Sequence, residues 1–212
     1  MFENLKNKTI ILASQSARRQ ELLQMAGINF RVEYIPDLDE SYPKNLNISE
    51  IPLFIAKQKQ KAYKHLWSLD NHIVITADTI VVLENEIIGK PADKNEACKM
   101  LEKLSGKTHL VITGVSIKSN IKTNEFSAVT SVSFKPLTKE VIDYYVENYN
   151  PIDKAGAYGI QEWIGLTSIS GIEGSYFNVM GLPIDRVFDE LNSDFLTSNI
   201  YLVNEKANSI GL

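Results

Sequence analysis

Two hydroxyl groups and two guanidinium groups lie close together near the start of the chain, on Ser14, Ser16, Arg18 and Arg19. They follow a β-rich apolar run at residues 9–13, and Ser16 stands where a helix N-cap is expected. The end of a strand and the start of a helix direct unpaired backbone N–H groups at one place, which favours phosphate binding. The segment therefore predicts an anion site. An ordinary N-cap followed by two solvated arginines is the alternative.

A single carboxylate, on Asp78, interrupts an apolar segment that reads as two strands, at residues 72–76 and 79–83. Burying an unpaired carboxylate is costly. Asp78 is therefore expected either at a strand end that faces a cleft or in an internal ion pair. A role in catalysis and a purely structural role both remain open from these residues alone.

Two further polar side chains stand in glycine-containing stretches, Lys90 after Gly89 and Gln161 at the end of residues 153–161. Lys90 precedes Pro91, and a turn fixed by proline holds its lysine rigidly enough for a phosphate contact. The amide of Gln161 has both a donor and an acceptor, which suits the reading of a base edge. A solvent-facing turn lysine and an edge strand are the ordinary alternatives.

The composition is that of a globular protein of 212 residues, with 44% hydrophobic and 23% charged residues. The net charge of −4 argues against general binding to nucleic acid, which needs a basic face. Cys98 is the only cysteine, so no intrachain disulfide can form, and the histidines show no zinc spacing. No apolar signal peptide and no run as long as a membrane span is visible, so the cytoplasm is the expected compartment.

Strand-like and helix-like segments alternate along the chain, which predicts an α/β class. After a first helix that begins at Ser16, helices are expected at residues 51–67, 93–104, 138–149 and 183–191. Strands are expected at residues 72–76, 79–83, 86–88, 108–118 and 125–134, with short strands in the glycine-rich stretch 156–181. Residues 36–52 read as loop. Neither the P-loop motif nor the dinucleotide-binding glycine motif is present.

Six short motifs stand in one order along the chain, at residues 12–19, 77–79, 89–91, 104–108, 153–161 and 174–183. In these motifs the chain resembles the Maf family of nucleoside triphosphate pyrophosphatases over residues 10–191. The resemblance implies one catalytic domain at residues 1–191, with an elongated mixed β-sheet flanked by helices and two lobes around a central cleft, as in inosine-triphosphatase-like folds. The polar tail at residues 192–212 falls outside it. Ala17 departs from the proline that the family commonly has there.

The resemblance implies hydrolysis of a nucleoside triphosphate to the monophosphate and pyrophosphate, with a divalent cation such as Mg²⁺ or Mn²⁺. Asp78 falls on the family's proton acceptor, and Asp78 and Glu40 are the candidate metal ligands. Lys59 and Lys90 fall on the family's two lysines and complete the catalytic set. Lys59 belongs to a row of lysines on the expected helix 51–67, and such a row is usually solvated.

The resemblance places the substrate on the loop that opens the chain and on two later residues. Ser14, Arg18 and Arg19 fall on the family's phosphate-binding loop, which includes Ser16. Arg18, Thr79 and Gln161 match the specificity positions of the dTTP/UTP pyrophosphatases. Arg19, like Lys90, is expected to face a solvent-filled cleft.

Two other functions are compatible with the same residues. One is a pyrophosphatase for a different nucleotide, such as 7-methyl-GTP or a modified pyrimidine nucleotide. The other is a nucleotide-binding regulator of cell division, which would sense a nucleotide without hydrolysing it. The expected partner is a small nucleoside triphosphate, with no nucleic acid and no membrane, and a homodimer remains open.

Overall fold

The structure, a computed structural model, describes residue 5 and residues 7–193. Its centre is a sheet with the strand order β2-β1-β3-β5-β6-β7, and β4 pairs with β3 off this path. The strands are β1 (Thr9–Leu12), β2 (Arg31–Val32), β3 (His72–Leu83), β4 (Glu86–Ile88), β5 (Thr108–Lys118), β6 (Thr123–Phe134) and β7 (Ile169–Glu173). β1 runs parallel to β2 and β3, and the remaining pairings are antiparallel. The expected mixed sheet is confirmed.

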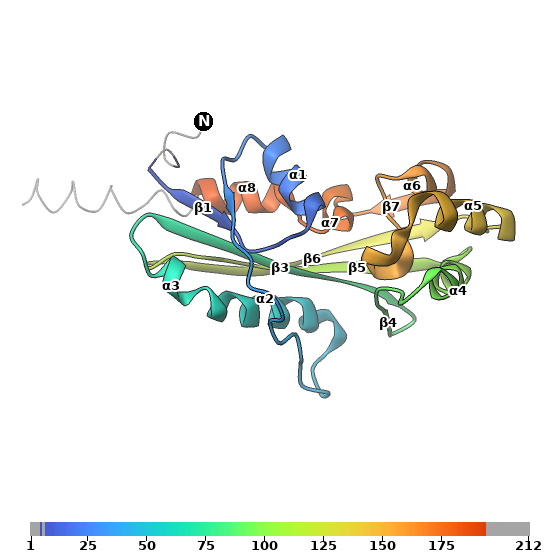
Figure 1. Cartoon of the computed structure of the whole chain (residues 1–212), viewed down its shortest axis with the longest axis horizontal. Coiled ribbons are helices and arrows are strands. Elements are labelled where there is room, and N and C mark those ends of the chain that lie inside the picture. Colours follow the sequence, from blue (N-terminus) through green and yellow to red (C-terminus); the bar gives the residue numbers. More distant parts are fainter. Residues whose placement is uncertain (1–4, 6, 194–212) are drawn as a thin grey trace, which may run out of the picture.

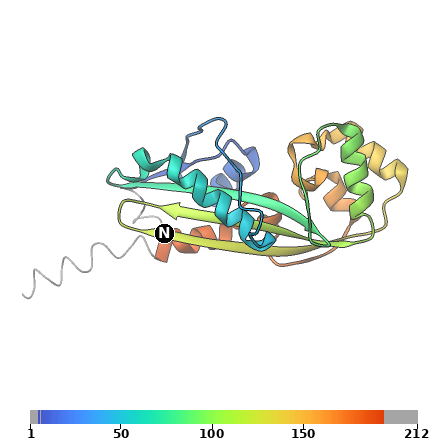
Figure 2. The same ribbon diagram turned by 90° about the horizontal axis from the view of Figure 1, so that it is seen from below.

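Helices cover both faces of the sheet (Figures 1 and 2). One face carries α1 (Ala17–Met25), α7 (Tyr176–Met180) and α8 (Ile184–Ser193), and the other carries α2 (Ile51–Ala62) and α3 (Lys64–Trp67). At one end of the molecule gather α4 (Lys94–Leu104), α5 (Lys139–Tyr149) and α6 (Trp163–Ser168). The long strands β3, β5 and β6 connect this end with the other, so the fold is elongated and has two lobes, as expected.

Alternation along β3 assigns its side chains to two layers, because successive residues of a strand point to opposite faces. Ile75 belongs to the main buried cluster, whereas Ile80 and Val82 pack with Ile55 of α2 in a second cluster. Even-numbered residues in the second half of β3 therefore face α2. By the same alternation Asp78 faces α2 as well.

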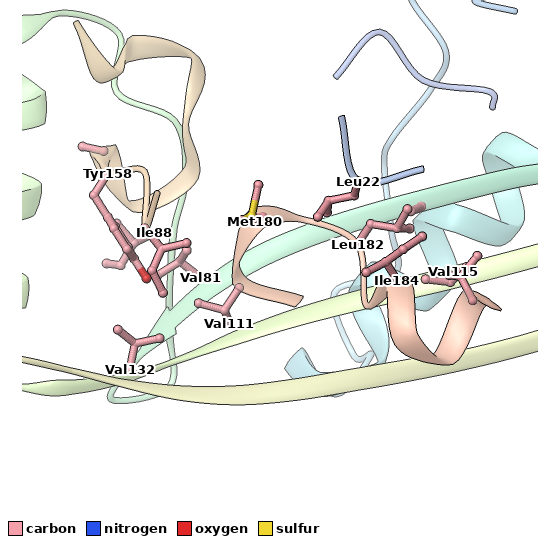
Figure 3. Close-up of a cluster of buried hydrophobic side chains, with 14 of the residues drawn as sticks. Leu22, Val81, Ile88, Val111, Val115, Val132, Tyr158, Met180, Leu182 and Ile184 are labelled. Atoms are coloured by element: carbon pink, nitrogen blue, oxygen red, sulfur yellow. The ribbon is translucent and has the colours of Figure 1, made fainter. Parts of the chain in front are cut away.

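The main buried cluster extends through both lobes (Figure 3). Tyr158 and Val81 lie in its part near the helical end, and Leu22 and Leu182 lie toward the other end. Val111 of β5 stands between these two groups. Because both lobes share this core along the sheet, the core holds the two lobes in a fixed position relative to each other.

Three predictions of secondary structure are wrong in detail. Residues 72–83 form one strand, because Asp78 keeps an extended backbone and pairs with β5. The helix expected at residues 51–67 breaks at Tyr63 into α2 and α3. The stretch 156–181 contains one strand, β7, and otherwise consists of turns and short helices.

Other local predictions are confirmed. The side chains of Ser16, Asp93 and Thr138 accept hydrogen bonds from the first turns of α1, α4 and α5. The hairpin of β5 and β6 and the helix after Pro183 are present, and the polar tail lies outside the described residues from residue 194 onward. Among the described helices, none has the length and apolar character needed to cross a membrane.

His109 on β5 is buried, with 1% of its surface exposed, and its Nε2 atom lies 2.7 Å from the hydroxyl oxygen of Tyr158. Burial lowers the pKa of His109 from 6.5 to about 4. Between these values the unfolded chain binds a proton at His109 and the folded chain does not. The free energy of unfolding therefore falls as the pH drops through this range.

We expect His109 alone to lower the free energy of unfolding by about 2 kcal/mol between pH 7 and pH 5. Urea unfolding of the wild type and of His109→Gln at both pH values measures this difference. The glutamine cannot be protonated, so the variant should lose that part of the pH dependence. An identical pH dependence in the two proteins would show that His109 is not the titrating group.

Candidate active site

The site lies at a gap along one edge of β3. β1 pairs with β3 as far as Ile75, and β4 begins its pairing at Val81, so within the described part of the chain no strand covers residues 76–80 on that edge. A cavity of about 970 Å³ opens there. All of the predicted site residues line it: Ser14, Ser16, Arg18, Arg19, Glu40, Lys59, Asp78, Thr79, Lys90 and Gln161. The fold therefore brings together residues that are far apart in the sequence.

Asp78 projects from the middle of β3 toward α2 and forms an ion pair with Lys59. The Lys59 Nζ atom lies 2.8 Å from Asp78 Oδ1 and also 2.8 Å from Glu40 Oε1. The side chains of Asp78 and Lys59 are each 15% exposed. Two carboxylates thus converge on one ammonium group. Asp78 therefore forms an internal ion pair and also faces a cleft, which the sequence analysis treated as alternatives.

The close approach of α2 to the sheet depends on Gly114 of β5, which pairs with Asp78. A Cβ atom at Gly114 would lie 2.1 Å from the backbone nitrogen of Leu53 in α2. Real Cβ atoms do not approach backbone this closely, so only glycine fits here. The absence of a side chain on β5 lets α2 bring Lys59 within hydrogen-bond distance of Asp78.

Burial raises the pKa of the Asp78 carboxyl above its ordinary value, although the positive charges of Lys59 and Arg19 act in the opposite direction. A charged carboxylate that has lost most of its water is a stronger base than one in bulk solvent. This environment suits a group that must accept a proton near neutral pH.

Glu40 comes from the loop between β2 and α2. Its side chain is 57% exposed. The loop is attached to α2 by a hydrogen bond of 2.7 Å from Gln58 Nε2 to the Ser41 carbonyl. Glu40 is therefore anchored through Lys59 and through the neighbouring backbone, and it stands at the open side of the cavity.

The serines of the N-terminal loop organise the start of α1. Ser14 Oγ accepts hydrogen bonds from the Ser16 backbone N–H and from Arg19, at 3.2 and 3.3 Å. Ser16 Oγ accepts from the Arg19 backbone N–H at 3.5 Å, which confirms the predicted N-cap. The positive end of the α1 dipole therefore points into the cavity, together with the guanidinium of Arg18.

Arg19 differs from the expectation that it faces a solvent-filled cleft. Its guanidinium donates to the carbonyls of Ala77 and Gly181, at 2.8 Å each, and to the hydroxyls of Ser14 and Thr79. The Ala77 carbonyl lies on the uncovered edge of β3, so Arg19 satisfies an acceptor that a neighbouring strand would otherwise use. Arg19 lines the cavity and also joins β3 to the segment after α7.

Thr79 faces the layer opposite to Asp78, is partly buried and lines the cavity. Its hydroxyl accepts from Arg19 at 3.1 Å and lies 2.9 Å from the Thr113 hydroxyl and 3.3 Å from the Gly181 carbonyl. Thr113 in turn donates to the carbonyl of Asn178 at 3.3 Å. Sequence reasoning missed Thr113, which stands in no motif, and Asn178, which lies in the motif at residues 174–183 but carried no assigned role. Only the fold brings them to Thr79.

Lys90 and Gln161 belong to two neighbouring turns on the far wall of the cavity. The Gly89 carbonyl accepts from the Gly156 backbone N–H at 2.9 Å, which attaches the turn of Lys90 to the segment that leads to Gln161. Within the described residues the Lys90 side chain has no hydrogen bond or ion pair, and it is exposed. The Gln161 Oε1 atom is buried and has no partner there either. The Lys90 ammonium and the Gln161 Oε1 atom therefore have hydrogen-bonding capacity that no described residue uses.

The backbone that carries Gln161 is not an edge strand, which was the alternative for residues 153–161. It forms two short 3₁₀ turns, η3 (Pro151–Asp153) and η4 (Ala155–Ala157), and the second contains Gly156 with φ of 71°. This left-handed conformation favours glycine. The segment is therefore built from turns, and the Gly156 backbone N–H attaches it to the Gly89 carbonyl.

Comparison with known proteins bears directly on this arrangement. Residues 9–194 match the family model described as Maf-like protein, and this match covers both lobes and the whole cavity. The chain belongs to the Maf family. The resemblance inferred from six motifs is thereby confirmed.

Several relatives of this Maf-family chain carry the name dTTP/UTP pyrophosphatase. The protein of Phocaeicola vulgatus is 53% identical over 191 residues, which are 90% of this chain and 98% of the relative. The protein of Porphyromonas gingivalis is 48% identical over 200 residues, 94% of this chain and 100% of the relative. The protein of Bacteroides fragilis strain YCH46 is 49% identical over 191 residues, 90% of this chain and 98% of the relative.

Among solved structures, the Ham1 protein of Staphylococcus aureus is similar to 60% of this Maf-family chain and to 72% of its own chain. The sequence identity is 18% and the TM-score is 0.39. This likeness is too low to add to the fold described above.

Proposed function

We propose that this protein hydrolyses dTTP and UTP to the nucleoside monophosphate and pyrophosphate. The observation that carries the proposal is the buried, base-like Asp78 in one cavity with four cationic side chains, those of Arg18, Arg19, Lys59 and Lys90. The names of the relatives support the substrate class.

In the proposed reaction a water molecule attacks the α-phosphorus, and pyrophosphate leaves. Asp78 orients this water and accepts its proton. Lys59 occupies Oδ1 of Asp78, so we assign the proton to Oδ2. Negative charge grows on the phosphate oxygens and on the leaving group. Lys90 and the N-terminal end of α1 are the groups that stabilise it.

A divalent cation fits the donor groups of the cavity. The described residues contain no cluster of three or more histidine, cysteine or acidic side chains, so they form no complete protein cage for a metal ion. Mg²⁺ is typically held by one or two carboxylates together with substrate phosphates and water. Asp78 and Glu40 supply two such carboxylates, since both already converge on a cation, Lys59. When bound, Mg²⁺ or Mn²⁺ would neutralise charge on the phosphates.

Recognition of the base is assigned to Gln161 together with Thr79. The unpartnered Oε1 of Gln161 can accept from the N3–H of a pyrimidine, and its amide N–H can donate to a neighbouring carbonyl. The hydroxyl of Thr79 already accepts from Arg19 and has two further oxygen atoms beside it, so it is held in one orientation. Arg18 is the third residue that we assign to substrate choice.

Gln161→Glu is expected to change base selectivity more than it changes the chemistry. A carboxylate accepts but cannot donate, so it repels a pyrimidine carbonyl, whereas it can accept from the N1–H and amino group of guanine. We predict that the ratio of kcat/KM for UTP to that for GTP falls by about tenfold or more. Gln24→Glu, on the exposed side of α1 and away from the cavity, is the matched control. An unchanged ratio would remove Gln161 from base recognition.

The general test of the proposed function is a panel of nucleoside triphosphates, including 7-methyl-GTP, with detection of pyrophosphate and with or without Mg²⁺ or Mn²⁺. We expect metal-dependent release of pyrophosphate, fastest with dTTP and UTP. A preference for 7-methyl-GTP would support the other pyrophosphatase activity. Tight binding without release of pyrophosphate would support a nucleotide-sensing regulator.

The same proposal includes expectations about the location and the binding partners of the protein. They are a cytoplasmic location, no partnership with nucleic acid and, as an open possibility, a homodimer. All three stay predictions.

A further inference from the structure

An ion pair crosses the cavity between the two lobes. Arg18, in the first turn of α1, has its Nη1 atom 3.1 Å from Oδ2 of Asp153, at the end of η3. The other carboxylate oxygen of Asp153, Oδ1, lies 2.8 Å from Nζ of Lys154. Asp153 thus uses both oxygens on cations, one from each wall of the cavity.

The contacts continue from Lys154 into the helical lobe. Lys154 Nζ lies 3.1 Å from Oε1 of Glu162, and its side chain is 9% exposed. The other oxygen of Glu162 accepts a hydrogen bond from the hydroxyl of Tyr145 in α5. We call the five residues Arg18, Asp153, Lys154, Glu162 and Tyr145 the cross-cavity chain.

The cross-cavity chain is tied to the backbone that carries Gln161. The Tyr145 hydroxyl oxygen accepts from the backbone N–H of Gly159 at 3.0 Å. A Cβ atom at Gly159 would lie 2.7 Å from Cδ of Glu162, so this carboxyl group packs directly on the turn before Gln161. The same side chains therefore determine where Arg18 and Gln161 stand.

Stabilisation of the fold is a poor explanation for the ion pair of Arg18 and Asp153 at the end of the cross-cavity chain. The side chain of Asp153 is 65% exposed and that of Arg18 is 26% exposed, and exposed ion pairs stabilise a fold only weakly. What the pair does is orient a flexible side chain. Without Asp153, the guanidinium of Arg18 would be free to move toward the triphosphate, which carries more charge than any neighbouring group.

We infer that Asp153 is a positioning residue, which holds Arg18 against the wall of the cavity that carries Gln161 and so sets base selectivity. Lys154 and Glu162 keep Asp153 in place. The inference rests on the proposed function, because it names a residue that acts through one of the assigned substrate contacts.

The first test is Asp153→Ala, which removes both contacts of the carboxylate. We expect the ratio of kcat/KM for UTP to that for GTP to fall by about tenfold, the effect of losing one charge-assisted hydrogen bond. The control is Glu147→Gln. It removes the carboxylate of an exposed ion pair, Lys94–Glu147, that lies away from the cavity. The control should leave the ratio unchanged. Asp153→Asn, which keeps the shape, should give an intermediate ratio and serves if the alanine variant does not fold.

The second test asks whether Asp153 acts through Arg18. In an Arg18→Gln background, Asp153→Ala should cause no further change in the ratio, because the group that it positions is absent. A further change there would overturn the inference. So would equal losses for UTP and GTP in the Asp153→Ala single variant, since a merely structural role lowers both alike.

The inference can fail separately from the proposed function. Equilibrium binding of the α,β-methylene analogues of UTP and GTP gives the same selectivity ratio without hydrolysis. If the wild type binds the UTP analogue selectively but releases no pyrophosphate from UTP, the proposed reaction is wrong and the positioning role is still measured. If UTP is hydrolysed selectively and Asp153→Ala keeps that selectivity by both measurements, only the positioning role is wrong.

Discussion

Replacing Asp78 by asparagine is expected to lower kcat for UTP by about 10²–10⁴-fold, the usual cost of losing a general base. Asparagine keeps the volume and the extended backbone of β3 but cannot take a proton from water. Removing a buried charge also removes its desolvation cost, and Lys59 retains Glu40 as a partner. The melting temperature should therefore fall little, so the loss of turnover reports chemistry.

The measurement is the steady-state rate of pyrophosphate release by the wild type and Asp78→Asn at saturating UTP and metal. Asp70→Asn is a suitable control, since Asp70 accepts a hydrogen bond from Asn120 on the surface outside the cavity. A folded Asp78→Asn protein with turnover close to that of the wild type would exclude Asp78 as the base.

Arg19→Ala is expected to lower both activity and stability. The substitution takes away four hydrogen bonds. The Ala77 carbonyl loses its guanidinium donor, whereas the Gly181 carbonyl keeps the Thr79 hydroxyl at 3.3 Å. Breaking a buried charged contact of this kind typically costs about 3 kcal/mol. For a chain of this size that loss lowers the melting temperature by roughly 10 °C. Activity falls as well, because Arg19 holds Ser14 and Thr79 in place.

Lys90→Ala is the informative comparison for Arg19→Ala. Lys90 lines the same cavity but has no partner within the described residues. Its removal should lower kcat/KM by about tenfold or more and leave the melting temperature nearly unchanged. Thermal unfolding and UTP kinetics of both variants separate the two cases. An Arg19→Ala protein as stable as Lys90→Ala would mean that the contacts of Arg19 stabilise nothing.

Local patterns in the sequence predict some parts of this site well. The caps of α1, α4 and α5 and the hairpin of β5 and β6 depend on residues close to one another in the chain, so they could be predicted. The chemical type of Asp78 could be recognised, but its place in mid-strand could not. A charged residue inside an apolar run looks like an interruption, and only the gap between β1 and β4 shows how a continuous strand can carry it.

Long-range contacts account for what the sequence could not predict. Arg19 stands in a first turn like any solvated arginine, and its bond to the carbonyl of Gly181 joins residues 162 positions apart. Lys59 looks like Lys57 and Lys61 beside it, and only packing through Gly114 turns it toward Asp78. The role of Lys59 is what the family resemblance implies, because helical spacing alone does not show which lysine faces the sheet.

The most direct test of the central claim is hydrolysis of UTP in ¹⁸O-labelled water, with mass spectrometry of both products. Attack of water on the α-phosphorus predicts UMP that carries one ¹⁸O atom and pyrophosphate that carries none. Label in the pyrophosphate would place the attack at the β-phosphorus. Release of UDP and orthophosphate, or no metal-dependent hydrolysis at all, would contradict the proposed reaction.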